Sequence, residues 1–196
     1  MSYVDVTSKG LDRWEATKSF MYLDTYIKNG VPSPLVTTGK GCAISINEAV
    51  NLPFYLGDRP ATQQEINQDF LSIKSAPFGY VADFYAKFSK VRLKSEGIEE
   101  LVRKRFVVFI AGLEAMFPEF DSFPESAKAG CLDLIYGLGV AGLDKPHYPL
   151  FHKSVENKNW KTASLQCDAN ASMRAYDQRN QARRNLFIQA AHEANL

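Results

Sequence analysis

The chain has 196 residues, 45% of them hydrophobic and 12% aromatic, so it is long and apolar enough to bury one sizeable core without a partner. Its 23 lysines and arginines nearly balance 22 acidic residues. The resulting net charge of +1 gives no electrostatic signature of binding to nucleic acid or to a membrane.

The residues that most often bind metals are few and poorly spaced for that task. Cys42, Cys131 and Cys167 are too few for a disulfide scaffold, and they fit either one disulfide with a free thiol or three buried thiols. His147 and His152 do not have the spacing of a metal pair on a helix, so we expect them at the surface or in packing.

The N-terminal segment does not predict export. Residues 1–6 lack the charged-then-apolar pattern of a signal peptide, and no apolar run approaches the roughly 20 residues of a membrane-spanning helix. We therefore expect a chain that is made in the cytoplasm and does not insert into a membrane.

The predicted elements begin with a helix and a small sheet. Residues 7–20 have a helical pattern, with Thr7 or Ser8 as the cap. Residues 21–46 mix β-branched and aromatic residues with prolines, which favours a hairpin sheet whose tight turn is Asn29-Gly30.

A loop and two shorter helices come next. Residues 47–60 carry turn residues around an apolar anchor and indicate a loop. Thr62-Gln63-Gln64-Glu65 is a capping box, because its hydroxyl and its carboxylate can each bond a backbone amide at the helix start. The helix that it opens has an apolar stripe of Ile66, Phe70, Leu71 and Ile73. Another short helix is expected over residues 80–88.

The second half of the chain is helical. Residues 97–117 carry the longest helical pattern. Residues 122–125 have the sequence of a second capping box, and the helix that follows to Leu138 is apolar on most sides, which places it at the centre of the fold. A helix at Trp160 and a closing helix over about residues 179–194 complete the series.

Together these elements predict one α+β domain over residues 1–196. It is mainly helical, with a small N-terminal β-hairpin lobe over about residues 21–46 and a helical lobe over about residues 62–194. The chain shows no internal repeat and no interdomain linker.

Two carboxylates and a glycine-rich segment indicate a site. Glu15 lies near the end of the first helix, Asp24 follows nine residues later, and Thr37-Thr38-Gly39-Lys40-Gly41 comes behind both. Breaking a glycosidic bond requires one protonated carboxyl group to donate to the leaving oxygen and one ionised carboxylate to activate water. Glu15 suits the first role if apolar neighbours desolvate it, and Asp24 suits the second if it stays solvated.

The remaining residues of this segment have supporting roles in that hypothesis. Thr37 or Thr38 could hold the attacking water through its hydroxyl. Two glycines at alternate positions of a strand would leave one face open to a ligand. Each residue by itself has an ordinary alternative, since a helical glutamate is usually solvated and a threonine favours strands. The spacing of the whole set favours the site.

The same residues resemble a known family. Glu15, then Asp24 within Tyr22-Leu23-Asp24-Thr25, then Thr37-x-Gly39-x-Gly41, resemble the Glu / Tyr-x-Asp-Thr / Thr-x-Gly-x-Gly signature of T4-type phage lysozymes. Related muramidase domains occur in pesticin-type bacteriocins and in type VI secretion toxins. Further along, residues 132–139 resemble the family's buried central helix, residues 160–163 its W-x-x-A helix, and residues 179–187 its arginine-bearing final helix.

Three features depart from the family pattern. Ala16 stands where the family usually has glycine, and Cys42 stands where it commonly has histidine. Residues 26–34 form a longer insertion than in the phage enzymes, so the sequence leaves open which threonine faces the site.

The resemblance implies a lysozyme-like fold and a muramidase that cleaves the β-1,4 bond between N-acetylmuramic acid and N-acetylglucosamine in peptidoglycan. The mechanism would be inverting, without a cofactor or metal: Glu15 protonates the leaving oxygen, and Asp24 with Thr37 directs water. Tyr136 and Arg179 would contact substrate. In general, an aromatic such as Tyr136 is more often core, and arginines at 179, 183 and 184 more often form a solvated face.

The resemblance also implies a setting. The chain would act as a monomer on peptidoglycan in the periplasm or cell wall after delivery by another machine, and a cognate immunity protein could block it. Phage lysis enzyme, bacteriocin and injected effector all fit. A lytic transglycosylase, which needs no Asp24, and a non-catalytic peptidoglycan-binding module are the alternative functions.

Overall fold

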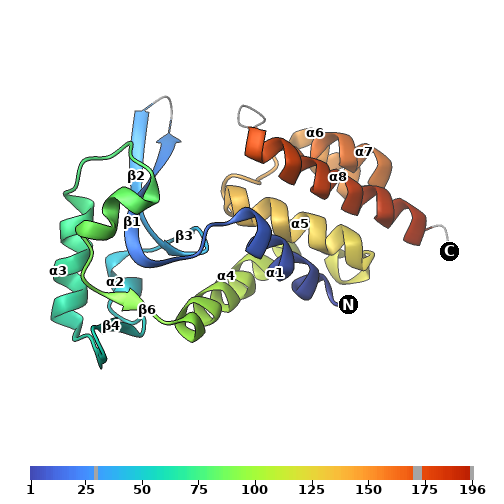
Figure 1. Cartoon of the computed structure of the whole chain (residues 1–196). Coiled ribbons are helices and arrows are strands. Elements are labelled where there is room, and N and C mark those ends of the chain that lie inside the picture. Colours follow the sequence, from blue (N-terminus) through green and yellow to red (C-terminus); the bar gives the residue numbers. More distant parts are fainter. Residues whose placement is uncertain (29–30, 170–173, 195–196) are drawn as a thin grey trace. The chain divides into compact units, whose positions relative to one another are not determined.

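The computed structural model describes residues 1–28, 31–169 and 174–194 and divides into two compact units (Figure 1). The terminal unit consists of Met1–Trp14 and Phe106–Leu196, and the inner unit is Glu15–Arg105. The fold is α+β and mainly helical with small antiparallel sheets, which confirms the predicted class. The inner unit is larger than the β lobe expected over residues 21–46, because helix α3 (Gln63–Lys74) and a second sheet belong to it.

The main sheet of the inner unit has three antiparallel strands in the order β1-β2-β3 (Figure 1). They are β1 (Lys18–Lys28), β2 (Val31–Gly39) and β3 (Cys42–Ala43). The sheet was predicted, but it begins at Lys18, so the helix expected up to residue 20 was wrong at that end. The expected turn at Asn29-Gly30 lies outside the described residues.

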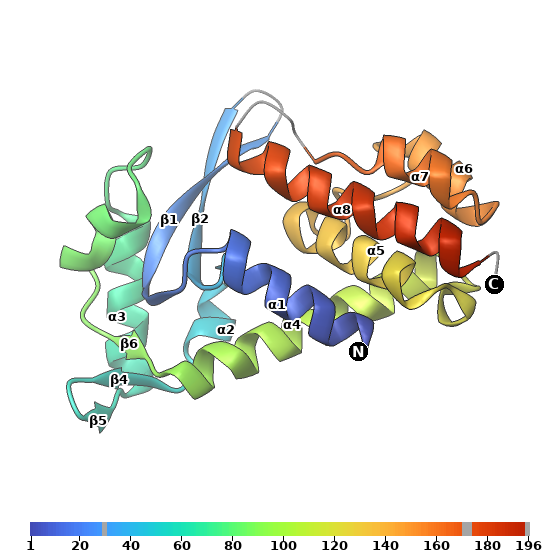
Figure 2. The ribbon, with the colours of Figure 1, turned by 45° about the vertical axis from the view of Figure 1, so that its right-hand side comes forward.

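Residues 47–60, expected as a loop, contain most of a short helix and two strands of a second sheet. After the short helix α2 (Ile46–Ala49), strand β4 (Phe54–Leu56) pairs with both β5 (Arg59–Pro60) and β6 (Arg92–Leu93) (Figure 2). Phe54 is buried and lies opposite Leu93. The pairing of β4 with β6 joins strands far apart in the chain and leaves no local pattern. The hairpin of β4 and β5 is too short to show a clear alternation, so the sequence indicated a loop.

Helix α3 (Gln63–Lys74) begins as predicted. The Thr62 hydroxyl accepts a hydrogen bond from the backbone of Glu65, and the Glu65 carboxylate accepts one from the backbone of Thr62. Ile66, Phe70 and Ile73 are buried, but Leu71 is 53% exposed and does not belong to the apolar stripe. The helix expected over residues 80–88 is the 3-10 helix η1 (Ala82–Lys87), which packs against β1.

The first helix of the terminal unit, α1 (Tyr3–Trp14), starts earlier than predicted. Ser2 is its cap: the Ser2 hydroxyl accepts from the Asp5 amide at 3.2 Å, and the Asp5 carboxylate accepts from the Ser2 amide at 3.3 Å. Thr7, expected at the cap, lies inside the helix, and its hydroxyl donates to the carbonyl of Tyr3. A shifted cap moves the whole helix toward the N-terminus.

Two long helices follow, α4 (Ser95–Met116), which begins in the inner unit and ends in the terminal unit, and α5 (Glu125–Leu138). Helix α5 is buried on nearly every side, as predicted. The capping box expected at residues 122–125 was wrong. The Ser122 hydroxyl donates to the Glu119 carbonyl, and Glu125 accepts from the Tyr3 amide and pairs with Lys128. The short 3-10 helix η2 (Phe120–Ser122) lies just before this position.

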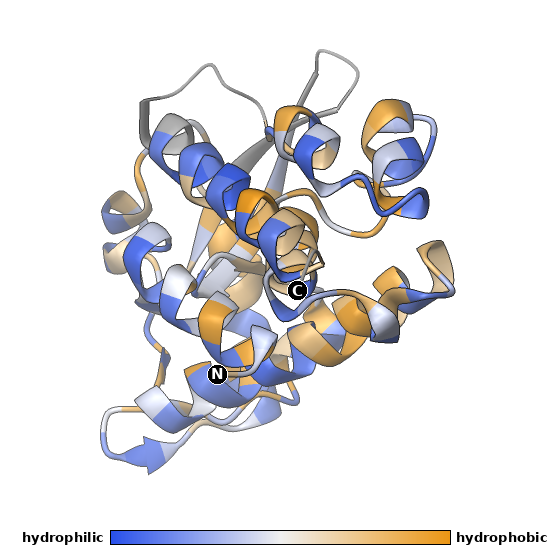
Figure 3. Ribbon diagram, turned by 90° about the vertical axis from the view of Figure 1, so that its right-hand side faces the viewer, coloured by the Kyte–Doolittle hydropathy of each residue, from blue (hydrophilic) through white to orange (hydrophobic). Residues whose placement is uncertain are grey.

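Three helices complete the terminal unit: α6 (Pro149–Glu156), α7 (Trp160–Gln166) and α8 (Arg174–Glu193). Helix α8 starts before residue 179, where the closing helix was expected, and packs against α5 (Figures 1 and 2). The contact is close, because a Cβ on Gly130 would lie 2.8 Å from the Phe187 ring. Figure 3 shows hydrophilic and hydrophobic residues alternating along the helix that leads to the C mark, α8.

Within the described part of the chain, none of the helices combines the length and the hydropathy that crossing a membrane requires.

Candidate functional site

The predicted acid Glu15 lies in the inner unit directly after the last residue of α1. Its side chain is half-buried, and a Cβ added to Gly41 would lie 2.9 Å from its Oε2 atom. The carboxylate therefore rests against the backbone of Gly41, at the turn before β3. Gly41 has a φ of +71°, a conformation that other residues adopt only with strain. One position thus needs glycine for two separate reasons.

The second acid, Asp24, lies on the more exposed face of β1. Met21 and Leu23 of this strand are buried, whereas Tyr22 is half-buried and Asp24 is exposed, as the alternation of a strand requires. Tyr22 lies directly opposite Thr37 of β2. Residues directly opposite each other in an antiparallel pair share a face, so Thr37 lies on the face of Tyr22 and Asp24.

The two candidate threonines point to opposite faces of the sheet. The Thr37 side chain is 1% exposed, and its hydroxyl donates to the Leu35 carbonyl at 3.2 Å. The Thr38 side chain lies on the face of Met21 and Leu23, where its hydroxyl donates to the Phe20 carbonyl at 3.1 Å. Of the two, Thr37 is therefore the one that shares a face with Asp24.

Tyr22 feels the charge of both acids. Burial raises the pKa of the Tyr22 hydroxyl, and the charges of Asp24, Glu15 and Cys42 raise it further. The phenol stays protonated at neutral pH and lies within electrostatic range of both carboxylates. Sequence reasoning did not assign Tyr22 a role, although its place two residues before Asp24 on a strand was a usable signal.

The two glycines of the segment Thr37–Gly41 have a different role from the one expected. Gly39 and Gly41 do not leave a strand face bare, because they form the turn between β2 and β3, and both have positive φ, +64° and +71°. Gly39 also packs against Ile98 and Leu101 of α4. The open strand face expected at Gly39 and Gly41 was wrong, because strand β2 ends at Gly39.

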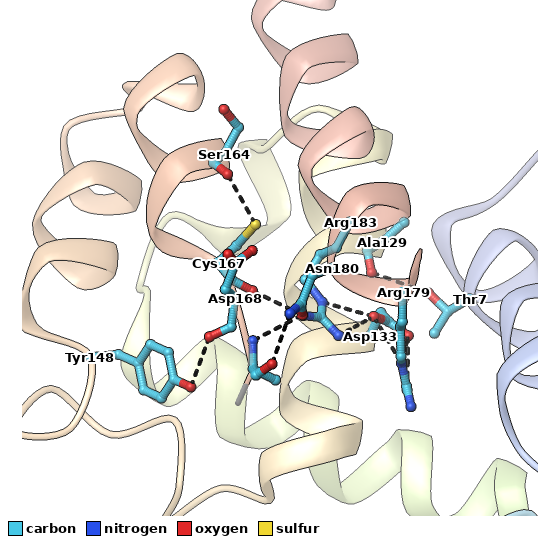
Figure 4. Close-up of polar contacts among 11 residues, drawn as sticks. Thr7, Ala129, Asp133, Tyr148, Ser164, Cys167, Asp168, Arg179, Asn180 and Arg183 are labelled. Carbon is cyan, nitrogen blue, oxygen red and sulfur yellow. Dashed lines mark hydrogen bonds and ion pairs between the residues drawn. The ribbon is translucent and has the colours of Figure 1, made fainter. Parts of the chain in front are cut away.

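Arg179 of the terminal unit belongs to a buried polar cluster (Figure 4). Asp133 of α5 accepts from the Nε of Arg179 at 3.0 Å and from the Nε of Arg183 at 2.8 Å, so two guanidinium groups meet one carboxylate. Arg183 also donates to the Cys167 carbonyl and to Asn180. The cluster fixes α8 on α5.

The solvated face expected for the three arginines was therefore wrong. Arg179 and Arg183 are 6% and 1% exposed, and Arg184 is half-buried and paired with Asp168. A usable signal was missed in the sequence: Asp133 is an acidic residue in the middle of an apolar helix, and a buried charge needs a partner.

Tyr136, the other predicted substrate contact, packs edge-on against two rings of α4. Its ring centroid lies 5.9 Å from that of Phe106 and 5.7 Å from that of Phe109. The side chain is half-buried. These contacts fit the ordinary core role that an aromatic has more often.

The three cysteines and His152 have packing roles in the structure, and His147 lies at the surface. Cys42, Cys131 and Cys167 are all free and buried. His152 is buried, with its Nε2 2.7 Å from the Leu143 carbonyl, and His147 is exposed beside Asp144. Among the described residues, no group of three or more His, Cys, Asp and Glu side chains is arranged to hold a metal ion.

The fold and the site together define an α+β protein with two carboxylates of unlike exposure in one compact unit. No known protein-family model matches this chain, and no curated protein sequence matches it either.

Proposed function

We propose that this chain is a peptidoglycan hydrolase, a muramidase of lysozyme-like fold that cleaves the β-1,4 bond between N-acetylmuramic acid and N-acetylglucosamine. The observation that carries the proposal is the pair of acids in the inner unit. Glu15 is half-buried against Gly41, and Asp24 is exposed. The charge of each carboxylate raises the pKa of the Tyr22 hydroxyl. Unlike environments allow two carboxylates to take different roles. The resemblance to the T4-type phage lysozyme signature is the reason for proposing peptidoglycan as the substrate.

The proposed mechanism is a single displacement with inversion. Glu15 donates its proton to the glycosidic oxygen as the bond to the anomeric carbon breaks. Asp24 takes a proton from a water that attacks the same carbon from the opposite face. An inverting pair stands roughly 6.5–9.5 Å apart, against about 5–5.5 Å for a retaining pair, because the water needs room.

Thr37 has a positioning role in this proposal, supported by the face that it shares with Asp24. Tyr136 and Arg179 are proposed to contact the glycan or its stem peptide. The Asp133 carboxylate holds the Arg179 guanidinium in a fixed orientation.

The proposed setting follows from the substrate. The enzyme would work as a monomer in the periplasm or on the cell wall after delivery by another machine, and a cognate immunity protein could block its site.

The test is digestion of purified sacculi by wild type and by the Glu15→Gln and Asp24→Asn variants, followed by mass spectrometry of the released muropeptides. We expect reducing muropeptides from wild type, and a loss of about a hundredfold or more for each variant with an unchanged circular dichroism spectrum. Glu96→Gln, an exposed substitution in the same unit, is the matched control and should keep full activity.

Three outcomes would contradict the proposal. Anhydro-muropeptides, with activity kept in Asp24→Asn, would identify a lytic transglycosylase. Binding to sacculi without any released product would identify a non-catalytic module. Full activity in Glu15→Gln would remove this carboxylate from the mechanism.

A further inference from the structure

A group of aromatic side chains lies at the surface of the inner unit, around η1. We call Phe78, Tyr80, Phe84 and Phe88 the aromatic surface. Phe78 and Tyr80 are each 53% exposed, and the neighbouring Val81 is 78% exposed. Large apolar side chains that are exposed within one short segment mark a candidate interaction site.

Three rings of the aromatic surface, Tyr80, Phe84 and Phe88, pack against one another. Tyr80 stacks on Phe84 with centroids 4.0 Å apart and an interplanar angle of 13°. The Lys87 Nζ lies 4.2 Å from the Phe84 centroid and 5.1 Å from that of Phe88. With one face against Phe84, Tyr80 presents its remaining surface to solvent in a fixed orientation.

The base of the aromatic surface is anchored to the strand that carries Asp24. Tyr85 is fully buried, and its hydroxyl donates to the Pro77 carbonyl at 2.9 Å. Lys18, the first residue of β1, pairs with Asp83 of η1 at 2.5 Å. The aromatic surface and Asp24 therefore belong to one compact unit and are connected through β1.

The segment that carries these rings is rich in basic residues, and Lys87 lies over two of the rings. Residues 74–94 contain five basic residues against one acidic residue, a net charge of +4 in a chain whose total is +1. The acidic residue, Asp83, is neutralised by Lys18. The basic residues are Lys74, Lys87, Lys90, Arg92 and Lys94, and all four lysines are exposed. The surface is complementary to an anionic partner.

We propose that the aromatic surface is a second binding site, separate from the two acids, for a strand of anionic cell-wall glycan. Sugar rings would stack their C–H faces on Phe78 and Tyr80, while the lysines pair with the carboxylates of the polymer. The choice of glycan rests on the proposed function, since peptidoglycan combines sugar rings with carboxylates. Single-stranded nucleic acid also suits aromatic and basic surfaces, but the near-neutral charge of the whole chain does not favour it.

The experiment measures binding apart from catalysis. Full-length Glu15→Gln protein is sedimented with purified sacculi, with and without the added pair Phe78→Ala and Tyr80→Ala. We expect binding about tenfold weaker in the variant, because truncating exposed aromatic anchors removes most of their contact. Leu150→Ala with Leu165→Ala, two leucines that are 60% and 72% exposed in the terminal unit, is the matched control and should bind normally.

A second arm tests the charges. Lys87→Gln with Lys90→Gln should weaken binding at low salt and have little effect at high salt, where screening already removes the attraction. On a short soluble glycan, the aromatic variant in the active background should keep the wild-type kcat/KM, since the site is separate from the two acids.

The outcomes separate this proposal from the hydrolase. Unchanged binding to sacculi in the aromatic variant overturns the second site, even if wild type digests the wall. The second site is also overturned if the aromatic variant loses binding to single-stranded DNA or to anionic vesicles but still binds sacculi. Binding through the aromatic surface without any digestion supports the second site and overturns the hydrolase. A melting temperature matched to the parent protein confirms that each variant is folded.

Discussion

At the scale of single residues, the proposed site depends on close contacts around Glu15. Its carboxylate lies against Gly41, where a side chain would collide with it, and Tyr22 lies within range of both acids. The position of the carboxylate therefore depends on a backbone conformation and a close approach that favour glycine.

Replacing Gly41 by alanine should displace Glu15. The φ of +71° makes alanine cost about 1–2 kcal/mol of unfolding free energy, and the new Cβ would lie 2.9 Å from Oε2. We expect hydrolysis of sacculi to fall about tenfold or more, since catalysis depends on such placement.

Gly57→Ala is the matched control for this change. Gly57 has a φ of +62°, and a Cβ there would meet nothing within 4 Å. Urea denaturation should show a similar loss of stability with activity retained. Equal activities in the two variants would mean that the Gly41 contact does not position Glu15.

Asp133 is the residue on which the buried cluster depends. Asp133→Asn leaves Arg179 and Arg183 buried without their shared counter-charge, and we expect a loss of about 3–5 kcal/mol of unfolding free energy. Asp168→Asn, which affects the half-buried Arg184 pair, should cost about 1 kcal/mol or less. Denaturant titration measures both, and equal losses would contradict the central role of Asp133.

At the scale of elements, helix and strand ends determine where the side chains of the site point. The turn Gly39-Lys40-Gly41 reverses the chain after β2, and the strand alternation places Tyr22 and Asp24 on one face. Helix starts depend on caps in the same local way, as α3 illustrates with Thr62 and Glu65.

The start of α3 should lose stability in acid. Hydrogen bonds from Arg59 and from the Thr62 amide lower the pKa of Glu65 to about 2, from about 4.3 in an unfolded chain. A lowered folded-state pKa stabilises the fold above pH 4.3, and this contribution disappears as the pH falls from there to about 2.

Glu65→Gln tests this dependence. The difference in unfolding free energy between wild type and the variant should shrink as the pH is lowered from 5 toward 2, as measured by urea denaturation. Thr62→Ala, which removes the neutral half of the cap, should cost about 1 kcal/mol with far less dependence on pH. A constant difference between wild type and Glu65→Gln would refute the role of the ionised carboxylate.

At the scale of the whole molecule, the chain passes from the terminal unit to the inner unit and back. Each unit has its own buried residues, with Tyr85 and Phe54 in the inner unit and Leu132 and Phe187 in the terminal unit. A cysteine is buried in the inner unit and two are buried in the terminal unit, so thiol access reports on the folding of both.

All three thiols should resist alkylation in the native protein. Burial raises the pKa of the Cys131 thiol, and it raises that of Cys167 to about 12, so little reactive thiolate forms at pH 8. Mass spectrometry after iodoacetamide should show no adduct in buffer and three adducts in denaturant. Rapid labelling of one cysteine in buffer would show that its unit opens locally.

Local sequence signals were sufficient for much of this fold. The Thr62 capping box, the periodic pattern of α4, and the apolar α5 all appear as predicted, because each depends on residues within a few turns of one another. The second sheet was missed because Phe54 pairs with Leu93 across a long stretch of chain. The capping box before α5 was wrong because Glu125 bonds to Tyr3 instead.

The sequence by itself determined the class of fold and led to the prediction of the pair of acids, because periodicity, caps and motif spacing are properties of neighbouring residues. Only the tertiary structure decided that Thr37 shares the face of Asp24, that Gly41 supports Glu15, and that Asp133 binds two arginines. These relations join residues far apart in the chain, and they form only where packing brings strands and helices together and buries the charges between them.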